Sequence, residues 1–134
     1  MKKQGEKSKL VSGNIDFDNG VKVSINLPVV VFEEDGTYFY FCPALDLNGY
    51  GKTEQLAFES LKTTLGIYFE YTLAKNTLRE DLKKHGWKIP KSKVKPMIPP
   101  NLSQLLRDNI EFADIFNTKP IRTVSLPIEM PILA

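Results

Sequence analysis

The side chains that most often carry catalysis are scarce in this chain of 134 residues. His85 is the only histidine and Cys42 the only cysteine, so a cysteine or serine nucleophile would depend on that one imidazole as its base. His85 lies among lysines, where we expect a helix end at which cations interact favourably with the helix dipole. Cys42 ends an aromatic segment, where a buried and unreactive thiol is the simpler interpretation. The sequence therefore predicts a protein that is not an enzyme.

Carboxylates gather at two places, but neither pattern is typical of a metal site. Glu33, Glu34 and Asp35 lie together at an expected turn, and Asp46 lies in a later loop. Metal-assisted hydrolysis needs acidic side chains from separate elements that converge on one ion, whereas a turn cluster is usually a solvated tip. We expect no metal and no cofactor.

The loop that precedes the expected long helix is the best candidate for a binding site. Residues 48–53 resemble a phosphate loop only in their position, because they lack the G-x-x-x-x-G-K-S/T spacing. A scaffold of hairpin and helix can instead present the polar and aromatic side chains of this loop to a protein partner. The expected partner-binding residues are Asp46, Asn48, Tyr50 and Lys52.

A lysine-rich stretch supports an alternative function, the binding of DNA or RNA. Clustered cations release counterions from nucleic acid, and residues 83–95 hold such a cluster. Its prolines argue against a helix that reads base edges, so a solvated linker is the competing interpretation. The net charge of +2 does not by itself demand a polyanionic partner. The lysines of this alternative site are Lys83, Lys84, Lys88, Lys91, Lys93 and Lys95.

Hydrophobic periodicity predicts the strands that position these residues. Apolar residues alternate with polar ones at the start of residues 21–32, which indicates a half-buried strand that Pro28 places at an edge or bends. An Asp-Gly turn and the aromatic residues 37–42 complete a β-hairpin. We expect one alternate set of these aromatic residues, Phe39 and Phe41 or Tyr38 and Tyr40, to be buried under a helix and the other set to be more exposed. A short third strand fits around Tyr50.

Capping residues predict two helices after the hairpin. Thr53 is a suitable N-cap for a helix that runs to about Ala74, with one broad apolar stripe facing the sheet. Thr77 and Glu80 match a T-x-x-E capping box for a second, shorter helix. Gly86 suits the left-handed conformation that ends such a helix.

The last third of the chain is predicted to hold a connector, a helix and a strand. Residues 89–100 are rich in proline and lysine, which favours an extended connector. Asn101 or Ser103 is expected to cap one short helix, and residues 122–128 indicate a final strand.

The fold class predicted from these elements is α+β. We expect a small antiparallel sheet, made of the hairpin and the short third strand, with a long helix packed on one face. The expected divisions are a flexible basic tail at residues 1–9, an α+β domain at residues 10–88 and a C-terminal extension of connector, helix and strand at residues 89–134.

Composition indicates a soluble protein of the cytoplasm. Hydrophobic residues make up 42% of the chain and charged residues 25%, which is ordinary for a globular domain. A single cysteine fits a reducing compartment, and residues 1–10 lack the apolar segment of a secretory signal. The longest apolar run, residues 27–32, is far shorter than the about 20 residues that cross a bilayer.

One segment also carries a family pattern. A Pro-Val-Val strand with an acidic-Gly turn spans residues 28–36, and an aromatic strand ends in Cys42 and Pro43. A Gly-Lys-Thr step at residues 51–53 then opens a helix with Ala57 four positions after the threonine. With these motifs, residues 27 to about 71, about a third of the chain, resemble the HicB-like antitoxins of prokaryotic type II toxin–antitoxin systems.

The resemblance implies a partial ribonuclease-H-like core and a role as an antitoxin. Proteins of that family bind and mask a small toxin ribonuclease that cleaves messenger RNA, and many repress their own operon through a C-terminal DNA-binding module. Here residues 89–134 show no convincing module of that kind, and the loop at residues 45–51 is shorter than is usual in the family. We therefore expect a protein partner and a homo-oligomer, whereas the sequence does not predict operator binding.

Overall fold

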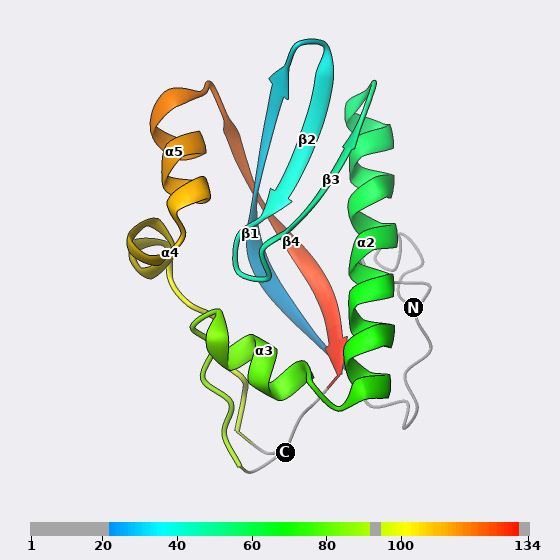
Figure 1. Ribbon diagram of the computed structural model, residues 1–134, viewed down its shortest axis with the longest axis vertical. Coiled ribbons are helices and arrows are strands. Elements are labelled where there is room, and N and C mark those ends of the chain that lie inside the picture. The colour runs from blue at the N-terminus through cyan, green and yellow to red at the C-terminus, as the bar shows by residue number, and fades with distance from the viewer. Residues whose placement is uncertain (1–21, 92–94, 132–134) are drawn as a thin grey trace, which may run out of the picture.

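A four-stranded antiparallel sheet lies between two sets of helices in the computed structural model, which describes residues 22–91 and 95–131 (Figure 1). The strand order is β3-β2-β1-β4, so the α+β class is confirmed. No helix within these two ranges is both long and apolar enough to cross a membrane. The elements are β1 (Lys22–Glu34), β2 (Thr37–Cys42), β3 (Leu47–Gly51), α2 (Glu54–Lys75), α3 (Leu78–Lys84), α4 (Leu102–Asp108), α5 (Ile110–Thr118) and β4 (Arg122–Pro131).

The expected hairpin joins β1 to β2 through a two-residue turn. Asp35 and Gly36 both have a positive φ, of 53° and 82°, which is the conformation that a tight hairpin turn of this length favours. β2 pairs with residues 30–34 of β1 only, while β4 pairs with residues 22–31 on the other side. The hairpin prediction is confirmed.

Prolines in the β1–β4 ladder are tolerated because of their register. All three prolines lie in cross-strand pairs that involve even-numbered residues of β1, so they share one hydrogen-bonding type. In a two-residue hairpin the pair that closes the turn is hydrogen-bonded. The backbone N–H and C=O groups of Glu34, and of every second residue before it, therefore point toward β2. Pro28 therefore directs its nitrogen away from β4, on a stretch of β1 that β2 does not reach. The three pairs are Pro28↔Ser125, Asn26↔Pro127 and Lys22↔Pro131.

The long helix α2 covers one face of the sheet. The Thr53 hydroxyl accepts a hydrogen bond from the Leu56 N–H at 3.1 Å, which confirms Thr53 as the N-cap. The helix buries an apolar stripe against side chains of the sheet, and the larger of the two hydrophobic clusters forms there. Buried members of this cluster from α2 and the sheet are Leu61, Leu65, Phe69, Leu27, Val29, Cys42, Ile128 and Met130.

A second hydrophobic cluster lies on the opposite face of the sheet. The expectation that one alternate set of the aromatic residues would be more exposed is therefore wrong. Tyr40 packs edge-on against Phe58 of α2, with ring centroids 5.7 Å apart. Phe41 points the other way and lies 6.2 Å from the ring of Phe112 in α5. Both faces are covered because α4 and α5 fold back over β1. The buried members of this second cluster are Val30, Phe32, Phe41, Leu105, Phe112 and Ile115.

Two short helices replace the single one expected after the connector. Asn101 caps α4 through a reciprocal capping box with Gln104. Asn109 then has an extended backbone, and its side chain accepts a hydrogen bond from the Phe112 N–H, which starts α5. The extended residue breaks the helical path and turns Phe112 and Ile115 toward the sheet.

The C-terminal strand belongs to the main sheet. β4 pairs with β1 along ten positions, so the sheet has four strands where the sequence predicted a hairpin and a third strand. Arg122 of β4 also donates two hydrogen bonds, of 2.8 and 3.2 Å, to the Glu54 carboxylate at the start of α2. These hydrogen bonds lower the pKa of Glu54. Residues 122–131 are thus part of the α+β domain.

The start of α3 differs from the prediction, whereas its end agrees. Thr77 has φ −113° and ψ 0°, not the extended backbone of a capping residue, and its side chain makes no capping hydrogen bond. The capping box with Glu80 is therefore wrong, because only Asn76 and Thr77 separate α3 from α2. Gly86 has the expected left-handed backbone, with φ 94°.

Candidate functional site

The short strand β3 presents the predicted loop residues on one side of the sheet. Gly49, in the middle of this strand, faces α2. A Cβ atom at this position would lie 2.1 Å from the Leu61 backbone nitrogen and 2.6 Å from the Ala57 backbone oxygen. Only glycine permits this close approach. The approach turns Asn48 and Tyr50, both exposed, toward the opposite side, where α5 lies.

Tyr50 extends a row of aromatic rings that crosses three strands. Its ring lies 6.2 Å from that of Phe39, which stacks on Phe32 at 5.0 Å. Phe32 is buried in the second cluster, whereas Tyr50 is 63% exposed. The row therefore runs from beneath α5 out to solvent and presents an aromatic surface beside Asn48.

A hollow of about 320 Å³ lies between this row and α5, and we call it the hairpin groove. Three of its lining side chains are carboxylates, those of Glu34, Glu111 and Asp114, and only Lys119 among the described lining residues is cationic. The Lys119 Nζ lies 3.3 Å from a Glu34 oxygen. The groove is thus aromatic and acidic. Its lining residues are Phe32, Glu34, Phe39, Phe41, Asn48, Glu111, Asp114, Ile115 and Lys119.

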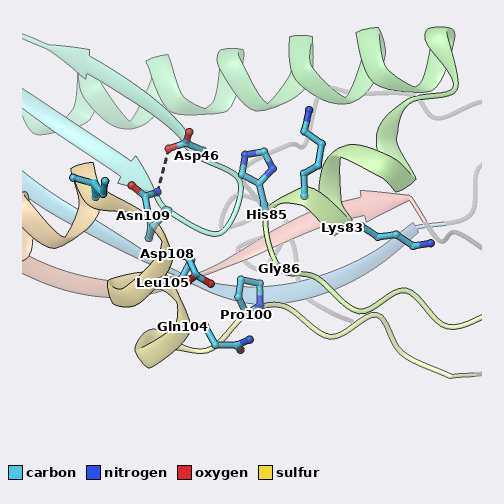
Figure 2. A pocket seen from close by; sticks show the side chains of 12 residues that line it. Asp46, Lys83, His85, Gly86, Pro100, Gln104, Leu105, Asp108 and Asn109 are labelled. Atoms are coloured by element: carbon cyan, nitrogen blue, oxygen red, sulfur yellow. Dashed lines mark hydrogen bonds between the residues drawn. The ribbon is translucent and has the colours of Figure 1, made fainter.

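A second hollow, the α3–α5 cleft, has a volume of about 430 Å³ and lies where the end of α3 meets the α4–α5 junction (Figure 2). Asn109 donates a hydrogen bond of 3.3 Å to the Asp46 carboxylate across its edge. Lys83 and Lys84 also line this cleft, so the structure brings part of both predicted sites together. Asp108 adds a second carboxylate, and the charge of the cleft is mixed.

His85 has a structural partner at the mouth of the α3–α5 cleft. Its Nδ1 lies 2.8 Å from the backbone oxygen of Asp81, so Nδ1 carries the proton and donates. Tyr68 of α2 donates a hydrogen bond to the Asp81 carboxylate, and burial together with that carboxylate raises the pKa of Tyr68. The Tyr68–Asp81 hydrogen bond joins α3 to α2, and His85 is placed at the helix end that the sequence predicted.

Cys42 is completely buried in the larger cluster. Burial raises the pKa of its thiol from 9.0 to about 12, so the thiol keeps its proton at neutral pH. Within residues 22–91 and 95–131, no three side chains among histidine, cysteine, aspartate and glutamate are placed to hold a metal ion.

The remaining predicted residues do not gather at either hollow. Lys52 is exposed at the start of α2 and lines neither of them. Lys88, Lys91 and Lys95 are exposed, and they too line neither hollow. Lys93 and the basic tail at residues 1–9 lie outside the described residues. The predicted partner site is therefore divided, with Asp46 in one hollow and Asn48 in the other.

The sequence prediction missed the acidic wall of the hairpin groove. Glu111 and Asp114 are three residues apart, so they share one side of a helix. That spacing was visible in the sequence, but only the break at Asn109 shows which way the helix faces.

The chain matches no family model, no curated protein and no solved structure. The similarity to HicB-like antitoxins stays a prediction from sequence motifs.

Proposed function

We propose that the protein is a non-enzymatic binding module that masks a protein partner by steric occlusion. The observation that carries this proposal is the outer side of β3, where the exposed Tyr50 ring lies beside Phe39, a lining residue of the hairpin groove. Exposed aromatic side chains beside a hollow are the usual anchors of protein interfaces. The close packing of Gly49 on α2 fixes the strand that carries them.

The partner that we propose is a small toxin that cleaves messenger RNA. The order of β1, β2, β3 and α2 supports this role, because the resemblance to HicB-like antitoxins implies that order in a partial ribonuclease-H-like core. In this proposal the strand β4 and the helices α4 and α5 are additions to the core. α5 supplies the acidic wall of the hairpin groove.

Charge favours a protein partner over nucleic acid. The hairpin groove has three carboxylates, which would repel phosphates. In the α3–α5 cleft, Asp46 and Asp108 oppose the attraction that Lys83 and Lys84 would exert on a polyanion. Binding to random RNA or DNA is therefore expected to be weak and to vanish as salt is raised.

Co-expression with the product of the neighbouring gene tests the proposal. If that product cleaves messenger RNA, the purified chain is expected to co-purify with it and to stop the cleavage at equimolar amounts. The double change Asp46→Ala and Tyr50→Ala is expected to weaken the complex by about 30-fold, as for the loss of an interface hot spot of about 2 kcal/mol.

The matched control is Tyr71→Ala on the outer side of α2. Tyr71 is 61% exposed, almost the same as Tyr50, but it lies on the other side of the sheet. The control is expected to bind like the wild type. Cleavage that continues in the presence of excess wild-type chain would contradict the proposal.

A further inference from the structure

We infer that the hairpin groove binds a basic segment of the partner, with an arginine side chain over the aromatic row and against the carboxylates of α5. This inference rests on the proposed function and adds the chemistry of the bound segment. It commits to a cationic peptide segment as the occupant.

The wall of the hairpin groove that α5 forms carries negative charge that no cation among the groove's described residues neutralises. Glu111 and Asp114 are both exposed and both line the groove. In the described part of the chain, neither carboxylate has an ion-pair partner. Glu34 differs, because Lys119 lies 3.3 Å from it. Two carboxylates are therefore left to receive a cation from outside.

The pair between Lys119 and Glu34 shows how an amine fits in this groove. Lys119 follows the last turn of α5 and reaches across to the end of β1, and its side chain is 27% exposed. The chain thus already places one ammonium group against the acidic lining. A cation from a partner would make the equivalent contact with Glu111 and Asp114.

Arginine fits this site better than lysine does. A guanidinium stacks on an aromatic ring while its edge donates hydrogen bonds to carboxylates. Phe39 and Tyr50 supply the rings, and Glu111 and Asp114 supply the acceptors from the facing helix. An apolar helix in the groove would leave these carboxylates without partners, and a nucleic acid would be repelled.

Fluorescence anisotropy with labelled peptides tests the inference on the intact chain. The probes are a peptide of alternating arginine and serine and a peptide of alternating glutamate and serine. We expect the arginine peptide to bind, with an affinity that falls as salt is raised, and the glutamate peptide not to bind. Equal binding of both peptides would overturn the inference.

Neutral variants of the acidic wall localise the binding. The change Glu111→Gln with Asp114→Asn is expected to weaken arginine-peptide binding by about tenfold, the equivalent of about 1.4 kcal/mol. The matched control is Glu70→Gln with Glu80→Gln. These two glutamates are also exposed on helices, and Glu80 lies in the first turn of α3 as Glu111 lies in the first turn of α5. The control is expected to bind like the wild type.

Two further variants change the affinity in opposite directions. Lys119→Gln removes the resident cation and frees Glu34, so the arginine peptide should bind more tightly. Tyr50→Ala should weaken binding by about two- to fivefold, as expected for an exposed cation–π contact. Weaker binding by the Lys119→Gln variant would contradict the assignment to the groove. Loss of affinity in the Glu70 and Glu80 control would contradict it as well.

The outcomes separate the two proposals. If the arginine peptide binds at the acidic wall but the neighbouring gene product is not masked, the toxin-masking function fails and the groove chemistry stands. If masking is normal and the Glu111 and Asp114 variant affects neither peptide nor masking, the inference fails and the proposed function stands.

Discussion

The two faces of the sheet are covered to different extents. On one face, the 22-residue helix α2 packs against β2 and β3 and buries a continuous apolar cluster. On the other, the short helices α4 and α5 cover part of β1 and leave the outer side of β3 open to solvent. The closed face supplies the stability that lets the open face expose an aromatic row and unpaired carboxylates.

Neighbouring residues of β3 give the sharpest test of this difference. Gly49→Ala should remove most of the folded protein, because its Cβ would overlap the backbone of α2 at 2.1 Å. We expect a loss of about 3 kcal/mol or more in the free energy of unfolding. Asn48→Ala, on the open face, should change it by less than about 0.5 kcal/mol. Urea denaturation measures both, and similar losses for the two variants would show that the faces are alike.

Truncation of the α2 stripe is expected to have the next largest effect. Leu61 is completely buried, and Leu61→Ala should lower the free energy of unfolding by about 2–5 kcal/mol because it leaves a cavity. Leu56 lies on the same helix but is 52% exposed, so Leu56→Ala should cost less than about 0.5 kcal/mol. A small effect at Leu61 would mean that α2 does not seal this face.

Alkaline pH should weaken the closed face through Cys42. Its thiol has a pKa of about 12 in the folded chain and 9.0 as the reference value, so the unfolded chain loses this proton first. The stability is therefore complete below pH 9.0 and falls as the pH rises, by at most about 1.4 kcal/mol per pH unit. Cys42→Ala should reduce this slope between pH 9 and 10 and leave the smaller part that comes from Tyr68, whose pKa is also raised, although the variant itself is less stable. An unchanged slope would assign the titration to another group.

The smallest effect is expected at Asp46, which joins the loop before β3 to α5. Asp46 has a positive φ of 58° and accepts the hydrogen bond from Asn109. Asp46→Asn should change the free energy of unfolding by less than about 0.5 kcal/mol, because asparagine tolerates this backbone and keeps an acceptor. Asp46→Ala loses both properties and should cost about 1 kcal/mol. Thermal melts of the two variants measure the difference.

Local signals in the sequence determined much of the closed face. The Asp-Gly turn, the N-cap at Thr53 and the left-handed Gly86 each depend on a few adjacent residues, and the structure confirms all three. The short third strand expected around Tyr50 is confirmed as β3. Such features follow from backbone preferences and capping, which do not require knowledge of the rest of the fold.

Tertiary structure alone decided how the open face was built. The sequence predicted a strand at residues 122–128, but not that it would pair with β1, about 100 residues earlier in the chain. The orientation of α5 depends on the break at Asn109 and on the burial of Phe112 against Phe41. The groove that Asn48 and Asp114 both line exists only because strand pairing and side-chain packing bring these distant segments together. Local propensity determines which elements form, whereas the burial of their apolar sides determines which of them meet.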